Sequence, residues 1–134
     1  MKDEISICLV DDNEASNFYH RQLIKRTGVS VDIREFQNGR EAMNYVLQCE
    51  AEDFPNIIFL DLNMPLLDGF EFLTELRDNC SENISDTCIV VLTSGEKSVS
   101  EAKCRAIYED ILFETKPMRL EQMKTILTQL STES

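Results

Sequence analysis

Three carboxylates in this sequence directly follow apolar runs, and their positions indicate metal chemistry. The run ISICLV leads into Asp11 and Asp12, and the run IIFL leads into Asp61. Short runs that are apolar throughout are typical of parallel strands covered on both faces. If the two strands are neighbours, the three acids lie at the carboxyl edge of the sheet, where open α/β sheets bind ligands. Their mutual repulsion favours a hard divalent cation such as Mg²⁺, which prefers oxygen ligands.

Two further polar groups are expected at the same edge. Thr93 closes a later apolar run, and Lys116 follows the last one. Three carboxylates, a hydroxyl and an ammonium suit phosphoryl transfer, in which one carboxylate attacks in line and the cations stabilise charge on the phosphoryl oxygens. Each residue alone has a plainer interpretation as a helix cap, a strand former or a solvated lysine. Their joint occurrence, one feature per strand end, favours the chemical interpretation.

The elements that must position these residues alternate along the chain. We expect strands at 5–10, 31–36, 57–60, 88–92 and 110–113. Helices are expected at 13–26, around 42–49, at 70–77, after residue 98 and after residue 117. Five alternations with short connections predict an α/β fold, a doubly wound sheet of five parallel strands with five helices on both faces.

Side-chain spacing gives further expectations for single helices. Asp68 is expected to cap the third helix, and Ser98 with Glu101 to form a capping box for the fourth. Apolar residues at helical spacing predict the buried faces of the first, fourth and last helices: Ala15, Phe18, Tyr19 and Leu23; Val99, Ala102 and Ala106; Leu120, Met123, Ile126, Leu127 and Leu130. The polar stretch 78–86 is expected to be a loop. His20 has polar neighbours and is expected at the surface.

Composition limits the possible functions. The 134 residues suffice for one domain with a real core, and the net charge of −12 argues against nucleic acid and against anionic membranes as partners. No apolar run approaches the roughly 20 residues that span a bilayer, and MKDEISI does not resemble a signal peptide, so a cytoplasmic location is expected. The five cysteines form no C-x-x-C pair, which makes a zinc site improbable and reduced thiols the expectation. Cys8 and Cys88 lie inside apolar runs and are expected in the core.

The residues at the strand ends resemble those of the receiver domain of two-component response regulators, especially stand-alone receivers such as the chemotaxis receiver. The matches are the acidic pair at 11 and 12, the block Asp61-x-x-Met64-Pro65-x-x-Asp68-Gly69, Thr93, and Lys116-Pro117. They cover nearly the whole chain and are highly specific in combination. The resemblance implies the flavodoxin-like strand order 2-1-3-4-5 and one receiver domain over residues 1–134.

The resemblance also implies a phosphoacceptor and its metal ligands. Asp61 would receive a phosphoryl group from a histidine kinase or a histidine phosphotransfer protein. Asp12 and Asp61 would ligate Mg²⁺ directly, together with the backbone carbonyl of Asn63. Asp11 would act mainly through a metal-bound water. The domain would catalyse only its own phosphorylation and dephosphorylation, so it is expected to be a switch and not an enzyme.

The remaining matching residues would bind the phosphoryl group and transmit its presence. Lys116 would pair with the phosphoryl oxygens, and Thr93 and Ser94 would belong to the phosphoryl-binding switch. Phe113 would turn inward when Thr93 moves, and the bond before Pro117 would be cis. Phosphorylation would then shift a population between two arrangements of the fourth helix, fifth strand and last helix, which an unidentified downstream protein would read.

Two other positions relate to the lifetime of the phosphoryl group. Asn63 and Gly95 occupy positions that tune this lifetime in the family, and the direction of the effect stays open. The stretch Ile107-Tyr108-Glu109-Asp110 stands where the family often has Gly-Ala after the fourth helix. Phe113 lacks the hydroxyl of the commoner tyrosine, so its switch would work by packing alone.

Three alternative functions remain open at this point. One is a small Mg²⁺-dependent phosphatase with an aspartate nucleophile, although such enzymes usually carry D-x-D after the first strand and Asp11-Asp12-Asn13 does not fit. The second is an interaction module that is not phosphorylated, against which stands the presence of every site residue. The third is a flavodoxin-like flavin binder, whose FMN phosphate the acidic strand ends would repel.

Overall fold

The computed structural model of the chain describes residues 4–64, 66–94 and 97–133, without the side chains of residues 97–99, 132 and 133. Pro65, Gly95 and the side chain of Ser98, which belong to the expectations above, therefore lie outside the described residues. None of the described helices is both long and apolar enough to cross a membrane.

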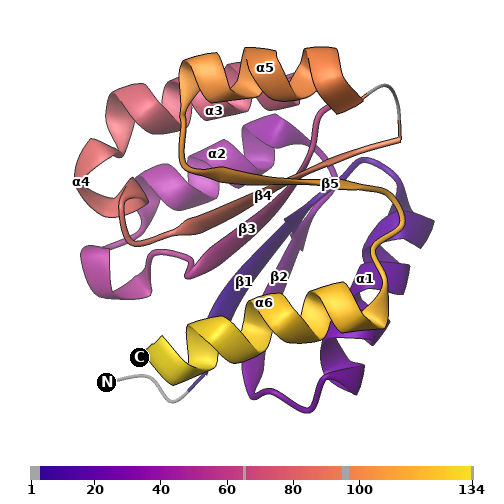
Figure 1. The fold of residues 1–134 in the computed structure, drawn as a ribbon. Helices are drawn as coiled ribbons and strands as arrows, with labels where there is room; N and C mark the ends of the chain where they lie inside the picture. The colour runs from indigo at the N-terminus through magenta and orange to yellow at the C-terminus, as the bar shows by residue number, and fades with distance from the viewer. Residues whose placement is uncertain (1–3, 65, 95–96, 134) are drawn as a thin grey trace.

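Five parallel strands form one sheet in the order β2-β1-β3-β4-β5, which confirms the predicted fold class and strand order (Figure 1). The strands are β1 (Ile5–Val10), β2 (Val31–Phe36), β3 (Ile57–Asp61), β4 (Cys88–Thr93) and β5 (Ile111–Thr115). β1 and β3 pair directly, with Val10 opposite Leu60. The residues that follow β1 and the residue that ends β3 therefore meet at the same edge of the sheet.

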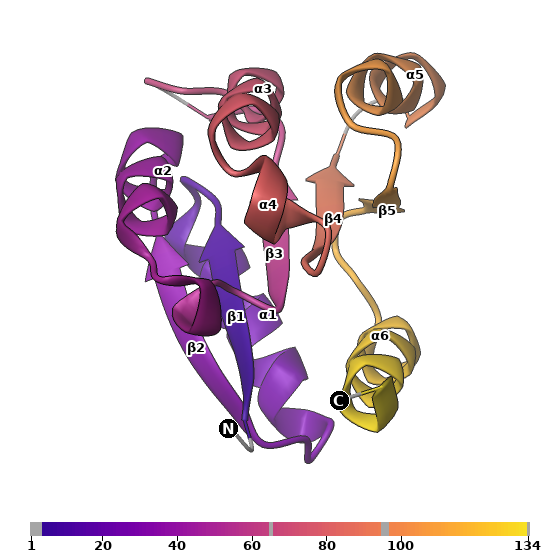
Figure 2. The same ribbon diagram turned by 90° about the vertical axis from the view of Figure 1, so that its left-hand side faces the viewer.

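Helices cover both faces of the sheet. The described residues form six α-helices: α1 (Glu14–Arg26), α2 (Gly39–Gln48), α3 (Gly69–Asn79), α4 (Ser81–Ile84), α5 (Lys97–Ile107) and α6 (Leu120–Glu133), with a 3-10 turn η1 (Ala51–Asp53). In Figure 1, α2, α3 and α5 lie above the sheet and α1 and α6 below it, and Figure 2 shows the same division from the side. The helices expected from the sequence as the fourth and the last are thus α5 and α6.

The short helix α4 corrects the expectation of a loop over 78–86 and raises the helix number from five to six. The backbone N–H groups of Asn83 and Ile84 both donate to the carbonyl of Cys80, at 3.0 and 2.9 Å. Ile84 is only 4% exposed and packs in the core. One apolar side chain in a single turn is too little to produce a recognisable helical period. The stretch was therefore expected to be a loop because its other residues are polar.

The core consists of two layers, one on each face of the sheet. Ile58 and Leu60 of β3 belong to the layer under α2, α3 and α5, whereas Ile57 and Phe59 belong to the layer over α1 and α6. All four side chains are at most 1% exposed. The uniformly apolar run that ends in Asp61 is therefore apolar because both of its faces are buried.

The start of α3 follows the expected chemistry. The Asp68 side chain accepts the N–H of Glu71, and the Glu71 side chain accepts the N–H of Asp68, a complete capping box. Helix α5 spans Lys97–Ile107, so it starts before Ser98, and the predicted capping box rests on the Ser98 side chain, which lies outside the described residues.

The predicted buried faces hold for α6 but only partly for α1 and α5. Met123 and Leu127 of α6 are fully buried, as predicted. In α5, Ala102 and Ala106 are exposed and Cys104 is buried instead. Small residues carry little burial energy, so their spacing is a weak guide to the face that packs. In α1, Leu23 is buried, but Phe18 is 62% exposed.

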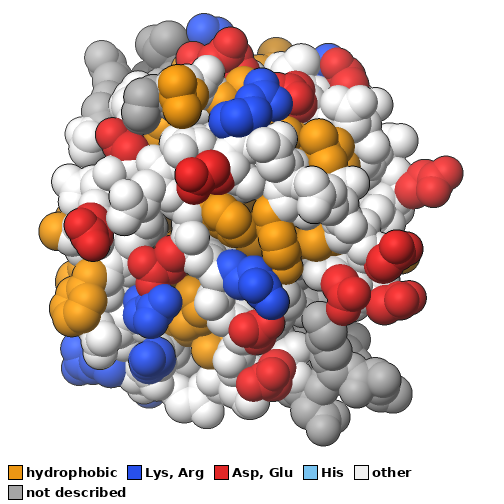
Figure 3. Space-filling model, turned by 180° about the vertical axis from the view of Figure 1, so that it is seen from behind, with side chains coloured by type: hydrophobic (Ala, Val, Ile, Leu, Met, Phe, Trp, Pro, Cys, Tyr) orange, Lys and Arg blue, Asp and Glu red, His pale blue; other side chains and the backbone are white. Residues whose placement is uncertain are grey.

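Strand β2 forms one edge of the sheet, at the back of the molecule in the view of Figure 1, and Figure 3 shows this side. Hydrophobic side chains gather at the centre of this view, and acidic and basic side chains surround them. Arg34 of β2 lies over the ring of Tyr45, with 5.3 Å between its guanidinium carbon and the ring centroid. Charged side chains on an edge strand discourage pairing with another chain.

The first residue of α2 packs directly against the loop that follows β3. A Cβ atom on Gly39 would lie 2.3 Å from the backbone oxygen of Leu67. Only glycine fits this approach, so the conformation of the loop after Asp61 depends on a residue that is distant in the sequence.

Candidate functional site

The structure brings the three sequence-predicted acids together at the carboxyl edge of the sheet. One carboxylate oxygen from each of Asp11, Asp12 and Asp61 lies within 4.8 Å of the others. Asp11 and Asp61 are each 4% exposed, whereas Asp12 is exposed. The site therefore has a buried pair of acids and a third acid at the surface.

Lys116 reaches this acid pair from the end of β5. Its Nζ lies 2.8 Å from Oδ2 of Asp11 and 3.5 Å from Oδ1 of Asp61. Burial lowers the pKa of Lys116, but the hydrogen bond to Asp11 and the negative charges of Asp61 and Asp11 outweigh it and raise the pKa above its usual 10.5. The peptide bond between Lys116 and Pro117 is cis, as predicted. The ammonium is thus held charged between the two buried carboxylates.

Asp11 is fully engaged by neighbouring donors. Its Oδ1 accepts the backbone N–H of Asn13 at 2.9 Å, and its Oδ2 accepts the Ser16 hydroxyl at 2.7 Å as well as Lys116. Burial alone would raise the pKa of Asp11, but the hydrogen bonds from Lys116, Asn13 and Ser16 together lower it. Asp11 is therefore stabilised as a carboxylate.

Asp61 is far less compensated. The backbone N–H of Asn63 donates to its Oδ1 at 3.4 Å, and Lys116 lies 3.5 Å away. Burial and the charge of Asp11 raise the pKa of Asp61 to about 6, against the opposing effects of Lys116 and Asn63. A buried carboxylate with a perturbed pKa beside a lysine is typical of a reacting group.

The other predicted switch residues lie on β4 and β5 and directly after β3 and β4. Thr93 is 2% exposed at the end of β4, and its carbonyl accepts the backbone N–H of Lys116 at 2.9 Å. Ser94 and Asn63 are exposed. Phe113 is 5% exposed and packs in the core, so the structure has this side chain in an inward position.

Sequence analysis missed two polar residues of α1 that support Asp11. The Ser16 hydroxyl binds the Asp11 carboxylate, and the Asn17 side-chain amide donates to the Asp11 carbonyl at 2.9 Å. Asn17 is 2% exposed. Their position, five and six residues after Asp11 in the first turn of the following helix, was the available signal.

The prediction that His20 is a surface residue is wrong. His20 is 2% exposed, with Nδ1 3.0 Å from the Ser16 carbonyl and Nε2 accepting the Met118 N–H at 3.4 Å. Burial lowers the pKa of His20. Its helical neighbours Ser16 and Asn17 are polar because they line the site, so local polarity did not indicate solvent here.

The donor set fits a hard divalent cation. All three clustered side chains offer carboxylate oxygens, and among the described residues this is the one group of three or more His, Cys, Asp or Glu side chains close enough to hold an ion. Oxygen ligands of this kind suit Mg²⁺ and Ca²⁺ and not zinc or copper. Burial and the charge of Asp11 raise the pKa of Asp61 in spite of Lys116, so a cation beside Asp61 would favour its carboxylate form.

Comparison with known proteins identifies relatives across the whole fold. Residues 7–128 match the family described as response regulator receiver domain. Response regulator MprA of Mycolicibacterium vanbaalenii is 36% identical over 121 residues, which are 89% of this chain and 47% of that protein. The chain therefore spans about half the length of this relative.

Solved structures show the same fold at low sequence identity. A two component response regulator from Cytophaga hutchinsonii superposes with a TM-score of 0.86 at 23% identity, covering 96% of this chain and 98% of that one. The Vibrio cholerae chemotaxis protein CheY4 superposes with a TM-score of 0.75 at 22% identity, covering 95% of this chain and 98% of that one.

Proposed function

The chain belongs to the family of response regulator receiver domains, and from this membership we propose that it accepts a phosphoryl group on Asp61. Receiver domains act in two-component signalling and are typically not classical enzymes. The donor is a histidine kinase or a histidine phosphotransfer protein, and residues 1–134 act as a single receiver domain in the cytoplasm.

One observation carries this assignment to Asp61 and not to Asp11. Both acids are buried, but Asp11 has three donors within 2.9 Å, whereas the two donors of Asp61 lie at 3.4 and 3.5 Å. The oxygens of Asp61 are therefore the less engaged, and its pKa is raised to about 6. A nucleophile must have a free lone pair, and Asp61 meets this requirement better.

The transfer itself is an in-line displacement. An oxygen of Asp61 attacks the phosphorus of a phosphohistidine, a P–O bond forms, and the P–N bond breaks as the imidazole leaves with a proton from solvent. Lys116, already 3.5 Å from Asp61, pairs with the transferred phosphoryl oxygens. The backbone N–H of Asn63, which now contacts Oδ1 of Asp61, is placed beside the same group.

The carboxylates of Asp11, Asp12 and Asp61 and the carbonyl of Asn63 would hold Mg²⁺, with Asp11 acting mainly through water. When bound, the ion supplies positive charge that stabilises the phosphoryl oxygens. This role is supported by the convergence of the three carboxylates within 4.8 Å.

The phosphoryl group would then bias the surface formed by α5, β5 and α6. Thr93 ends β4 and Ser94 follows it, and the Thr93 carbonyl accepts the backbone N–H of Lys116. Rearrangement of Thr93 toward the phosphoryl group, with Phe113 packed inward, shifts the population of this surface toward the form that a downstream protein reads.

Mass spectrometry after incubation with acetyl phosphate and Mg²⁺ tests the proposal. The wild type should gain one phosphoryl group, and Asp61→Asn should gain none. Asp86→Asn is the matched control, because Asp86 is an exposed carboxylate in a loop and its loss should leave uptake unchanged. Labelling of Asp61→Asn to the wild-type extent, or an unlabelled wild type, would overturn the assignment.

A further inference from the structure

We propose that Tyr19 and His20 of α1 are positioning residues that hold Lys116 against the two buried acids by binding both backbone groups of Met118. The positioning of Lys116 is argued from the contacts that α1 makes with Met118 and Asp11. Its consequence for phosphoryl uptake rests on the proposed function of Asp61.

Two consecutive residues of α1 bind the two backbone polar groups of a single residue, Met118. The Tyr19 hydroxyl donates to the Met118 carbonyl at 2.8 Å, and the Met118 N–H donates to Nε2 of His20 at 3.4 Å. The two rings pack edge to face, with centroids 5.2 Å apart. The Met118 side chain is fully buried in the core layer under α6. Met118 is thus fixed through its N–H, its carbonyl and its side chain.

Met118 follows Lys116 by two residues, and the chain between them has little freedom. The N–H of Lys116 is bound by the Thr93 carbonyl at 2.9 Å. Pro117 has no N–H and a fixed φ angle, so the N–H of Met118 is the next donor along the chain. The backbone around Lys116 is therefore held on both sides: β4 binds the N–H of Lys116 itself, and α1 binds the backbone of Met118, two residues later.

The same helix also holds the partner of Lys116. Because Nε2 of His20 accepts a hydrogen bond, its Nδ1 carries the proton and donates to the Ser16 carbonyl, 3.0 Å away. The Ser16 hydroxyl binds Oδ2 of Asp11 at 2.7 Å, and the same oxygen accepts Lys116 at 2.8 Å. Asp11, Ser16, His20, Met118 and Lys116 thus form a closed circuit of hydrogen bonds and backbone. α1 sets both ends of the Asp11–Lys116 pair.

This circuit matters because the ammonium must be in place before a phosphoryl group arrives. Small displacements of a charge-stabilising group from the reacting atoms cost rate steeply. Met118 N–H would also lose its acceptor without His20, and a buried unpaired donor favours rearrangement of its segment. Loss of either α1 residue should therefore let Lys116 move away from Asp11.

The test measures the side chain of Lys116 directly, by its acetylation with acetic anhydride in the folded protein, relative to the exposed Lys124 in the same sample. A lysine held in an ion pair reacts slowly. Tyr19→Phe and His20→Leu should raise the relative acetylation of Lys116 several-fold and lower the initial rate of acetyl phosphate uptake by about tenfold. His20→Gln, whose amide oxygen can accept the Met118 N–H, should restore both measurements toward the wild-type values.

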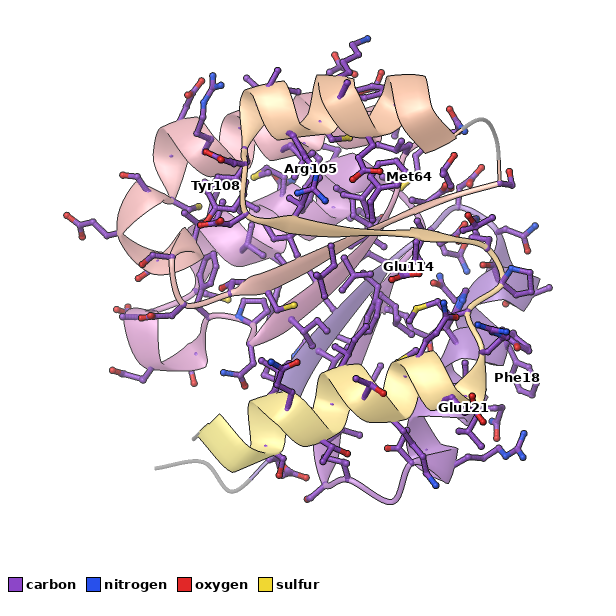
Figure 4. All side chains as sticks on the ribbon, in the orientation of Figure 1. Phe18, Met64, Arg105, Tyr108, Glu114 and Glu121 are labelled. Carbon is purple, nitrogen blue, oxygen red and sulfur yellow. The ribbon has the colours of Figure 1, made fainter. Side chains whose placement is uncertain are left out.

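Phe18→Leu is the control, because Phe18 lies on the same helix, is 62% exposed and projects from the side of the molecule (Figure 4). Neither measurement should change in this variant. All samples are compared at a temperature where circular dichroism shows each variant folded, and Tyr19→Phe decides the question if His20→Leu does not fold. Unchanged Lys116 acetylation in folded Tyr19→Phe, or no recovery in His20→Gln, would overturn the inference. An unlabelled wild type would overturn only the proposed function, since the acetylation measurement does not depend on phosphorylation.

Discussion

Lys116 and Asp11 are 105 residues apart in the chain, yet their side chains lie 2.8 Å apart at the edge of the sheet. The lysine is closer to Asp11 than to Asp61, so its positive charge stabilises the carboxylate of Asp11 more than that of Asp61. It lowers the pKa of Asp11, whereas the pKa of Asp61 rises to about 6. The pKa values of two carboxylates in one site thus shift in opposite directions, and Lys116 compensates the two unequally.

The first prediction concerns the cost of this arrangement. Asp61→Asn should stabilise the metal-free protein at pH 7, by about 1–3 kcal/mol. The folded-state pKa of Asp61 lies above its usual 3.8, so the folded state binds the proton more readily than the unfolded state does. The loss of folding stability caused by ionised Asp61 is therefore complete above about pH 6 and vanishes as the pH falls toward 4.

Urea denaturation at pH 7 and at pH 4 measures this effect, and the gain should shrink at the lower pH. Asp11→Asn is the matched comparison and should destabilise at pH 7, because the pKa of Asp11 is lowered and its donors would lose their acceptor. A lower free energy of unfolding for Asp61→Asn at pH 7 would contradict the account.

The second prediction removes the compensating charge. Lys116→Met should destabilise the protein at pH 7 by about 2–4 kcal/mol, because it leaves two buried carboxylates without their cation. Adding Asp61→Asn to Lys116→Met should recover part of the loss, since only one buried charge then remains. A double-mutant cycle by urea denaturation measures the coupling. Strict additivity would show that the lysine and Asp61 do not interact.

The third prediction concerns the metal. Mg²⁺ should raise the midpoint of thermal unfolding, because a ligand bound only by the folded state stabilises it, by about 1.4 kcal/mol at tenfold its dissociation constant. Asp12→Asn should reduce this rise, and Asp86→Asn should not. A midpoint that does not change with Mg²⁺ concentration in the millimolar range would argue against the site.

The fourth prediction tests the contact between the start of α2 and the loop after β3. Gly39→Ala should destabilise by about 1–3 kcal/mol, because the new methyl group would meet the Leu67 backbone oxygen. Gly28→Ala is the control: it has φ of +79° but nothing within 4 Å of a Cβ atom. It should cost only the strain of a left-handed backbone, about 1–2 kcal/mol. Unlike Gly28→Ala, Gly39→Ala should also shift the NMR resonances of the loop after Asp61.

The convergence of the acids could be predicted because it follows from strand pairing. Once β1 and β3 are parallel neighbours, Asp11 and Asp61 must share an edge, and apolar runs of this kind report such strands directly. Lys116 could be placed at the same edge because it follows the last predicted strand, whereas its pairing with phosphoryl oxygens and its cis bond to Pro117 were expected from the family resemblance alone.

The support of the site could not be predicted, because it consists of buried polar residues. Ser16, Asn17 and His20 read as a solvated helix face, yet Asn17 and His20 are each 2% exposed and bind Asp11 and Met118. A polar side chain can be satisfied by water or by protein, and sequence does not distinguish the two. Ile84 was missed because it is a single apolar residue among polar ones, and Cys104 because the neighbouring alanines suggested a different buried face of the helix.

The exposure of Asp12 beside two buried acids means that one of the three carboxylates faces solvent and the other two lie behind it. An ion arriving from solvent would meet this carboxylate first, while still carrying its full hydration shell. Asp11 and Asp61, buried behind Asp12, would supply further oxygen ligands. An exposed carboxylate at the entrance of the site suits Mg²⁺, which loses its water reluctantly. We therefore expect Asp12→Asn to slow association of the ion more than it speeds dissociation.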